Sequence, residues 1–152
     1  MKKAILVVDD DPQIRQSLGK LLSAEGYEAA LAADGQRGVE IFDTQQIDLV
    51  LLDINLPGSG GWEIFGAITS SNPFLPIIVI TGREDQQDLA TLAGVGALME
   101  KPLNLPLLLK SIREMIAEDS KARPSRRIGL RSDLRYVPPL HPRNVSLPKS
   151  NP

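Results

Sequence analysis

Carboxylates follow two short apolar runs in this chain, at the points where buried strands would end. Residues 5–8 read ILVV before Asp9 and Asp10, and residues 49–52 read LVLL before Asp53. Continuous apolar runs of this length are typical of strands buried on both faces of a parallel sheet. Such sheets place their ligand chemistry outside the carboxyl ends of the strands. A lone Asp after a strand more often caps a turn, so the interpretation depends on what else reaches that edge.

Two further strand ends carry polar residues. The run PIIVI at 76–80 leads to Thr81, and ALME at 97–100 leads to Lys101. Each residue alone has a simpler explanation, as a strand threonine or as a surface charge. Their occurrence after successive apolar runs, together with the carboxylates, indicates one shared polar site.

The chemistry of this set favours a hard metal ion and a phosphoryl group. Asp9, Asp10 and Asp11 repel one another unless they share a cation, and only one of them is needed to cap the helix that follows. Oxygen ligands beside a phosphate substrate favour Mg²⁺. A carboxylate beside such a metal can attack phosphorus and form an aspartyl phosphate. Lys101 can then neutralise one phosphoryl oxygen and Thr81 can donate a hydrogen bond to another.

Glycine and proline shape the loops around this edge. Pro57, Gly58, Gly60 and Gly61 impose a loop after the Asp53 strand, and Gly82 leaves room beside Thr81 for a phosphoryl group. The glycine-rich loop lacks the spacing and the lysine of a nucleotide phosphate loop. A nucleotide-binding fold is therefore disfavoured.

The elements that position these residues alternate along the chain. The pattern predicts strands near 4–8, 27–33, 49–52, 76–81 and 97–100, and helices near 12–25, 35–45, 62–69, 89–93 and 105–116. Five strands alternating with five helices predict an α/β fold with a doubly wound parallel sheet. The flavodoxin-like strand order 2-1-3-4-5 suits this length and makes strands 1, 3, 4 and 5 neighbours.

Composition separates the chain into two parts. Residues 1–119 hold 9 Lys and Arg against 18 Asp and Glu, whereas residues 120–152 hold 8 against 1. We expect one domain over 1–118 and a basic, proline-rich, disordered tail over 119–152, which is too short to form a core unaided. The chain has no cysteine and no apolar run of membrane-spanning length, so we expect a cytoplasmic protein that does not associate with a membrane.

Four blocks of the sequence resemble the receiver domains of two-component response regulators. They are ILVVDDDP at 5–12, LLDINLPGSGG at 51–61, TGR at 81–83 and EKP at 100–102. The resemblance covers residues 3 to about 117. It implies a signalling protein, not an enzyme beyond its own phosphorylation and dephosphorylation, whose partners are a sensor histidine kinase or a histidine phosphotransfer protein and an unknown downstream protein.

The same resemblance implies a role for each site residue. Asp53 would accept the phosphoryl group. Asp10, Asp53 and the backbone carbonyl of Asn55 would bind Mg²⁺ directly, and Asp9 would act through a water. Thr81 and Lys101 would sense the phosphoryl group, with a cis peptide at Lys101-Pro102.

One position departs from the family pattern. Three residues before the lysine, the family usually carries Tyr or Phe, whose rotation is coupled to the threonine. This chain has Leu98 there. The departure puts signalling through an aromatic switch in doubt, but not phosphorylation itself.

Two other functions remain open at this stage. The basic tail could serve a DNA-associated transcriptional regulator, although its dispersed arginines and single tyrosine disfavour nucleic acid. An aspartyl-nucleophile phosphohydrolase would also place an Asp at a strand end. Such enzymes need a second Asp two residues later as general acid, and this chain has Asn55 at that position.

Overall fold

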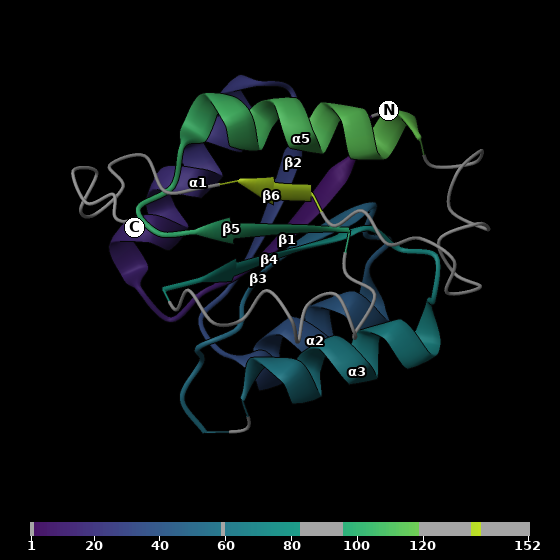
Figure 1. Cartoon of the computed structure of the whole chain (residues 1–152). Helices are drawn as coiled ribbons and strands as arrows, with labels where there is room; N and C mark the ends of the chain where they lie inside the picture. The colour runs from purple at the N-terminus through teal and green to yellow at the C-terminus, as the bar shows by residue number, and fades with distance from the viewer. Residues whose placement is uncertain (1, 59, 83–95, 119–134, 138–152) are drawn as a thin grey trace, which may run out of the picture.

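A parallel sheet with helices on both faces organises the part of the chain that the computed structural model describes, which is residues 2–58, 60–82, 96–118 and 135–137 (Figure 1). In chain order the elements are β1 (Ala4–Val8), α1 (Pro12–Ala24), β2 (Glu28–Ala32), α2 (Gly35–Thr44), β3 (Leu49–Asp53), α3 (Gly61–Ser71), β4 (Ile77–Thr81), β5 (Ala97–Glu100), α5 (Leu105–Ala117) and β6 (Arg135–Val137). The α/β class and the bounds of the first five strands agree with the sequence-based prediction to within about two residues.

Alternating side chains of the strands build two hydrophobic layers. On β1, Leu6 and Val8 belong to the layer that packs against α2 and α3, while Ile5 and Val7 belong to the layer under α1 and α5. Figure 1 shows α1 and α5 on one side of the sheet and α2 and α3 on the other. The strands β1, β3, β4 and β5 are buried throughout, because both of their faces are covered. The polar residues therefore lie at the ends of four fully buried strands.

The helices begin and end at the residues that the sequence indicates. The Asp11 side chain accepts hydrogen bonds from the backbone N–H groups of Gln13 and Ile14 at the start of α1, and Asn104 accepts one from Leu107 at the start of α5. Gly26 follows α1 with φ of 92°, the left-handed conformation that favours glycine after a helix. Of the three consecutive aspartates, Asp11 is thus the helix cap, and Asp9 and Asp10 remain for other roles.

The strand order is β2-β1-β3-β4-β5-β6, with every pair parallel. The predicted order 2-1-3-4-5 is confirmed for the first five strands. The sequence-based prediction did not include β6, because three residues carry too little pattern to predict a strand. Four helices lie in the part of the chain described here, and the helix predicted near 89–93 falls outside it. Among the described helices, none is long and apolar enough to cross a membrane.

Candidate functional site

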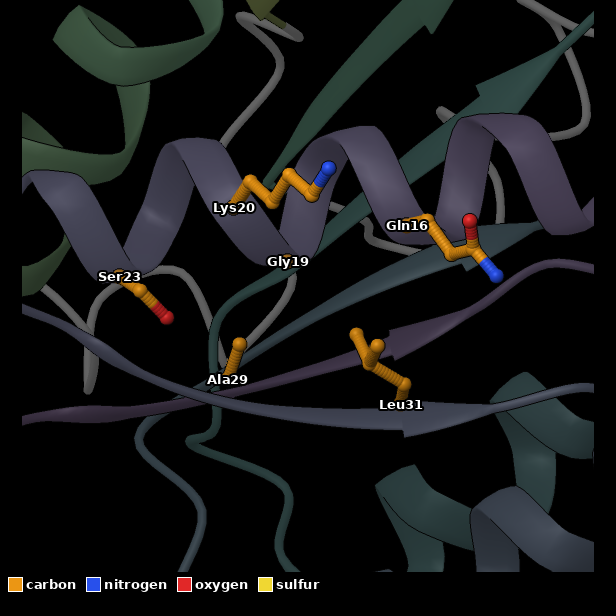
Figure 2. Close-up of a pocket in the computed structure, with 6 residues that line it drawn as sticks. All are labelled: Gln16, Gly19, Lys20, Ser23, Ala29 and Leu31. Atoms are coloured by element: carbon orange, nitrogen blue, oxygen red, sulfur yellow. The ribbon is translucent and has the colours of Figure 1, made fainter.

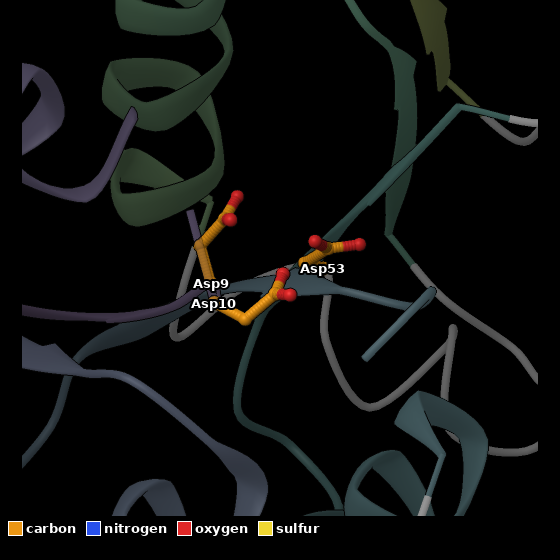
Figure 3. A group of neighbouring side chains, drawn as sticks. All are labelled: Asp9, Asp10 and Asp53. Carbon is orange, nitrogen blue, oxygen red and sulfur yellow. The ribbon is translucent and has the colours of Figure 1, made fainter. Parts of the chain in front are cut away.

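Four neighbouring strands bring their carboxyl ends to one point of the sheet. Asp9 follows β1, Asp53 ends β3, Thr81 ends β4 and Lys101 follows β5. One carboxylate oxygen from each of Asp9, Asp10 and Asp53 lies within 4.8 Å of the other two, and Figure 3 shows these side chains gathered at the strand ends. The exposed fractions are only 1% for Asp9 and 2% for Asp53, whereas Asp10 is exposed. The sequence-predicted group is therefore one cluster, open to solvent on the Asp10 side.

Both oxygens of the Asp53 carboxylate are held in place. The backbone N–H of Asn55 donates a hydrogen bond of 2.8 Å to Asp53 Oδ1, which closes a tight turn after β3. Lys101 Nζ donates to Asp53 Oδ2 at 3.2 Å. The carboxylate is thus oriented by its own turn and by a cation from β5.

Lys101 also contacts the second buried carboxylate of the cluster. Its Nζ lies 3.4 Å from Asp9 Oδ2. Burial lowers the pKa of Lys101, but the charges of Asp53 and Asp9 more than offset that effect, so its pKa is raised. Lys101 is therefore charged at neutral pH and bridges β1 and β3.

The pKa of the buried Asp9 carboxyl is raised above its ordinary value. Burial raises the pKa of Asp9, and its Asp53 neighbour adds to that effect, while the backbone N–H of Asp11 and the charge of Lys101 lower it without cancelling the rise. Asp9 Oδ1 accepts a hydrogen bond of 2.9 Å from Asp11. Asp9 Oδ2 is buried and accepts no hydrogen bond within the described part of the chain, although it lies at ion-pair distance from Lys101. Three carboxylates with one ammonium and one under-satisfied buried oxygen fit a divalent cation.

The side chain of Asn55 makes contacts that the sequence analysis did not predict. Its Oδ1 accepts hydrogen bonds from the Thr81 hydroxyl and from the Gly82 backbone N–H, each at 3.0 Å. Sequence reasoning assigned only the backbone carbonyl of Asn55, because an amide side chain after a strand gives no indication of its tertiary partner. Asn55 thus ties the loop after β3 to the end of β4 and orients the Thr81 hydroxyl.

The remaining predicted positions fall into structural roles. A side chain at Gly61 would collide with the backbone of Ile54, the residue after Asp53. Pro57 is exposed in the intervening loop, and the Lys101-Pro102 peptide is cis. Leu98 is fully buried in the layer that faces α2 and α3.

Two surface cavities lie away from the cluster. One, of about 500 Å³, opens between α1 and β2 and is lined by Gln16, Gly19, Lys20, Ser23, Ala29 and Leu31 (Figure 2). The other, of about 420 Å³, lies between the carboxyl ends of α2 and α3, where Phe42 and Ser71 contribute to its wall. Neither is lined by a residue of the carboxylate cluster, so the candidate site is separate from these two cavities.

Comparison with known proteins identifies the class. The family model for the response regulator receiver domain matches residues 5–113. The chain belongs to this family. Among solved structures, it is similar to a CheY-like receiver domain protein from Methanospirillum hungatei, with a TM-score of 0.75 and 33% identity over 80% of this chain and 98% of that one. It is also similar to the response regulator TrrA of Thermotoga maritima in complex with Mg(2+)-BeF, with a TM-score of 0.69 and 35% identity over 74% of this chain and 98% of that one.

The curated relatives are longer proteins. The chain is 36% identical to response regulator MprA of Mycolicibacterium vanbaalenii over 76% of this chain and 51% of that protein. It is 30% identical to transcriptional regulatory protein GlrR of Escherichia coli over 78% of this chain and 27% of that protein. The chain thus spans about half of the first relative and about a quarter of the second.

Proposed function

We propose that this chain is a receiver that is phosphorylated on Asp53 by a sensor histidine kinase or a histidine phosphotransfer protein, and that it signals by binding a downstream protein when phosphorylated. The observation that carries the proposal is the Asp53 carboxylate itself. It is 2% exposed, its Oδ2 accepts from Lys101 at 3.2 Å, and it shares a cluster with Asp9 and Asp10. Membership of the receiver family supports the same assignment.

Asp9, Asp10 and Asp53 are the side chains that would hold Mg²⁺, together with the backbone carbonyl of Asn55. The under-satisfied Oδ2 of Asp9 and the proximity of the three carboxylates support this set. When bound, the ion would neutralise charge on the phosphoryl oxygens. We assign Asp10 and Asp53 as direct ligands and Asp9 as a ligand through water.

The transfer step requires little of the protein beyond position and charge. An Asp53 oxygen attacks phosphorus, the P–N bond of the phosphohistidine donor breaks, and its electron pair returns to the imidazole nitrogen. The turn to Asn55 fixes the attacking carboxylate. Lys101, whose pKa is raised, stays protonated and pairs with a phosphoryl oxygen, and the Thr81 hydroxyl can donate to another after leaving Asn55.

A DNA-associated regulator is the second candidate, because relatives such as GlrR bear the name of transcriptional regulatory proteins. The tail would have to supply the nucleic-acid contacts, with 8 Lys and Arg over residues 120–152. We rank this function lower because the basic residues are dispersed and Tyr136 is the only aromatic residue there.

Intact-mass measurement after incubation with a small acyl phosphate donor and Mg²⁺ tests the proposal. We expect addition of one phosphoryl group to the wild-type chain, none to Asp53→Asn, and normal addition to Asp43→Asn, which alters an exposed carboxylate on α2. Chelation of the metal should abolish the addition. Undiminished phosphorylation of Asp53→Asn would refute the assignment.

A further inference from the structure

A strand from the tail lies along the outer edge of β5. β6 pairs with β5 in parallel, and the register places Arg135 beside Ala97, Tyr136 beside Leu98 and Val137 beside Met99. Figure 1 shows β6 next to β5 on the side away from β4. The sheet of the receiver is thereby extended by one strand that lies beyond the matched family region, which ends at residue 113.

The local sequence explains why these three residues form a strand. Tyr and Val are among the residues most enriched in strands. Val137 precedes Pro138, and the residue before a proline is biased toward extended backbone. Pro138 and Pro139 have no N–H group to donate, so the ladder has to stop there. Residues 135–137 are thus suited to pairing, and within the described residues of the tail they are the ones that pair.

The outer edge of β5 carries backbone groups that need hydrogen-bond partners. Without β6, one row of backbone N–H and C=O groups on β5 would face away from β4 with no strand to pair with. Ala97, Leu98 and Met99 are all at most 1% exposed, so this is a hydrophobic strand that contains no lysine and no proline to discourage pairing.

Charge and chain length also favour docking of the tail on its own domain. The tail is strongly basic and the receiver strongly acidic. The seventeen residues from 118 to 134 connect α5 to β6, which is ample length for a parallel return to β5. A tether of this length keeps the local concentration of the segment high.

We propose that the outer edge of β5 is a docking site for an extended peptide segment, and that residues 135–137 of the same chain occupy it in cis. A partner that adds a strand at this edge therefore has to displace the tail first. The proposal does not depend on phosphorylation of Asp53, so the experiments that test it do not test the proposed function.

Disulfide trapping tests the pairing, because the chain contains no native cysteine. Residues paired on neighbouring strands lie about 5 Å apart, which a disulfide can span. The variant Ala97→Cys with Arg135→Cys should form an intramolecular disulfide under mild oxidation. The control, Ala97→Cys with Val137→Cys, is two residues out of register and should oxidise more slowly. Equal rates for the two pairs would overturn the proposal.

The same variants decide which copy supplies the strand. A disulfide that forms within one chain, at a rate independent of protein concentration, supports docking in cis. Disulfide-linked dimers whose yield falls when the oxidation is carried out at lower protein concentration would show that the tail of a second copy occupies the edge, and would overturn the proposal in this form.

Hydrogen exchange provides a second measurement without cysteines. Val137→Pro removes a backbone N–H from β6 and should accelerate exchange at the amides of Leu98 and Glu100 by roughly tenfold or more, because alternate residues of a strand face opposite neighbours and these two face β6. Leu130→Pro, in the same tail but outside β6, should leave those amides unchanged. Protection across β1 and β3 reports that the fold is retained. Unchanged exchange at Leu98 and Glu100 in Val137→Pro would refute the pairing.

Discussion

Gly61 is the position where one methyl group should disturb the turn that carries Asp53. A Cβ added there would lie 2.6 Å from the carbonyl oxygen of Ile54 and closer still to its Cα, and backbone atoms cannot rotate away. Gly61 also donates its N–H to the Ile54 carbonyl at 3.2 Å, so helix α3 and the end of β3 are held together at this point. Gly61→Ala therefore has to move α3 or the residue that follows Asp53.

The magnitude follows from two opposing effects. Overpacking a close contact costs about 1–3 kcal/mol. Alanine is favoured over glycine inside a helix by at most about 1 kcal/mol, and by less at the first helical residue. We expect Gly61→Ala to lower the free energy of unfolding by roughly 1–2 kcal/mol.

Urea unfolding followed by the fluorescence of Trp62, the single tryptophan, measures this change. With a slope of about 1–3 kcal/mol per molar urea, the midpoint should fall by roughly 0.3–2 M. Gly66→Ala is the matched control on the same helix, since a Cβ at Gly66 meets no atom within 4 Å, and it should raise the midpoint. A midpoint for Gly61→Ala at or above that of the wild type would refute the reasoning.

Three other predictions follow from the site and the tail. Without divalent cations, Asp9→Asn should raise the melting temperature at pH 7, because burial raises the pKa of Asp9 and so disfavours its charged form in the folded protein. The stabilising contribution of protonated Asp9 is complete below pH 3.8 and is lost as the pH rises through the raised pKa of the folded protein. The increase in melting temperature of Asp9→Asn over the wild type should therefore vanish in acid. Because Leu98 stands where the family usually has an aromatic switch residue, binding of the phosphoryl mimic beryllofluoride with Mg²⁺ should change hydrogen exchange over residues 82–100 only slightly. Large changes there would show that the switch does not need an aromatic ring. Duplex DNA binding of the full chain and of a chain ending at Glu118 should be compared across a salt series, and neither should bind tightly. Micromolar binding by the full chain that is lost on truncation would favour the DNA-associated function, with the logarithm of the binding constant falling against the logarithm of salt concentration at a slope of roughly −0.9 per phosphate contacted.

The buried strands and the position of the site could be predicted because burial on both faces leaves an unmistakable pattern. LVLL before Asp53 and ILVV before Asp9 mark strand ends, and parallel topology then brings those ends together. Capping of α1 by one of the three consecutive aspartates was predictable for a similar reason, since capping is a local interaction, whereas the choice of Asp11 came from the structure.

The features that sequence reasoning missed depend on tertiary partners. The Asn55 side chain reaches Thr81 and Gly82, which lie 26 and 27 residues away. β6 is three residues long and is specified by the open edge of β5 as much as by its own sequence. Neither contact has a local periodicity from which it could be inferred.

The site of phosphorylation tests the central claim most directly. The wild-type chain is incubated with a phosphohistidine donor and Mg²⁺, reduced with borohydride, which converts an aspartyl phosphate to homoserine, and mapped by peptide mass spectrometry. We predict homoserine at position 53 and at no other aspartate, and none when Mg²⁺ is withheld. Reduction at Asp9 or Asp10, or an acid-labile phosphoryl group on His141, the only histidine, would contradict the account.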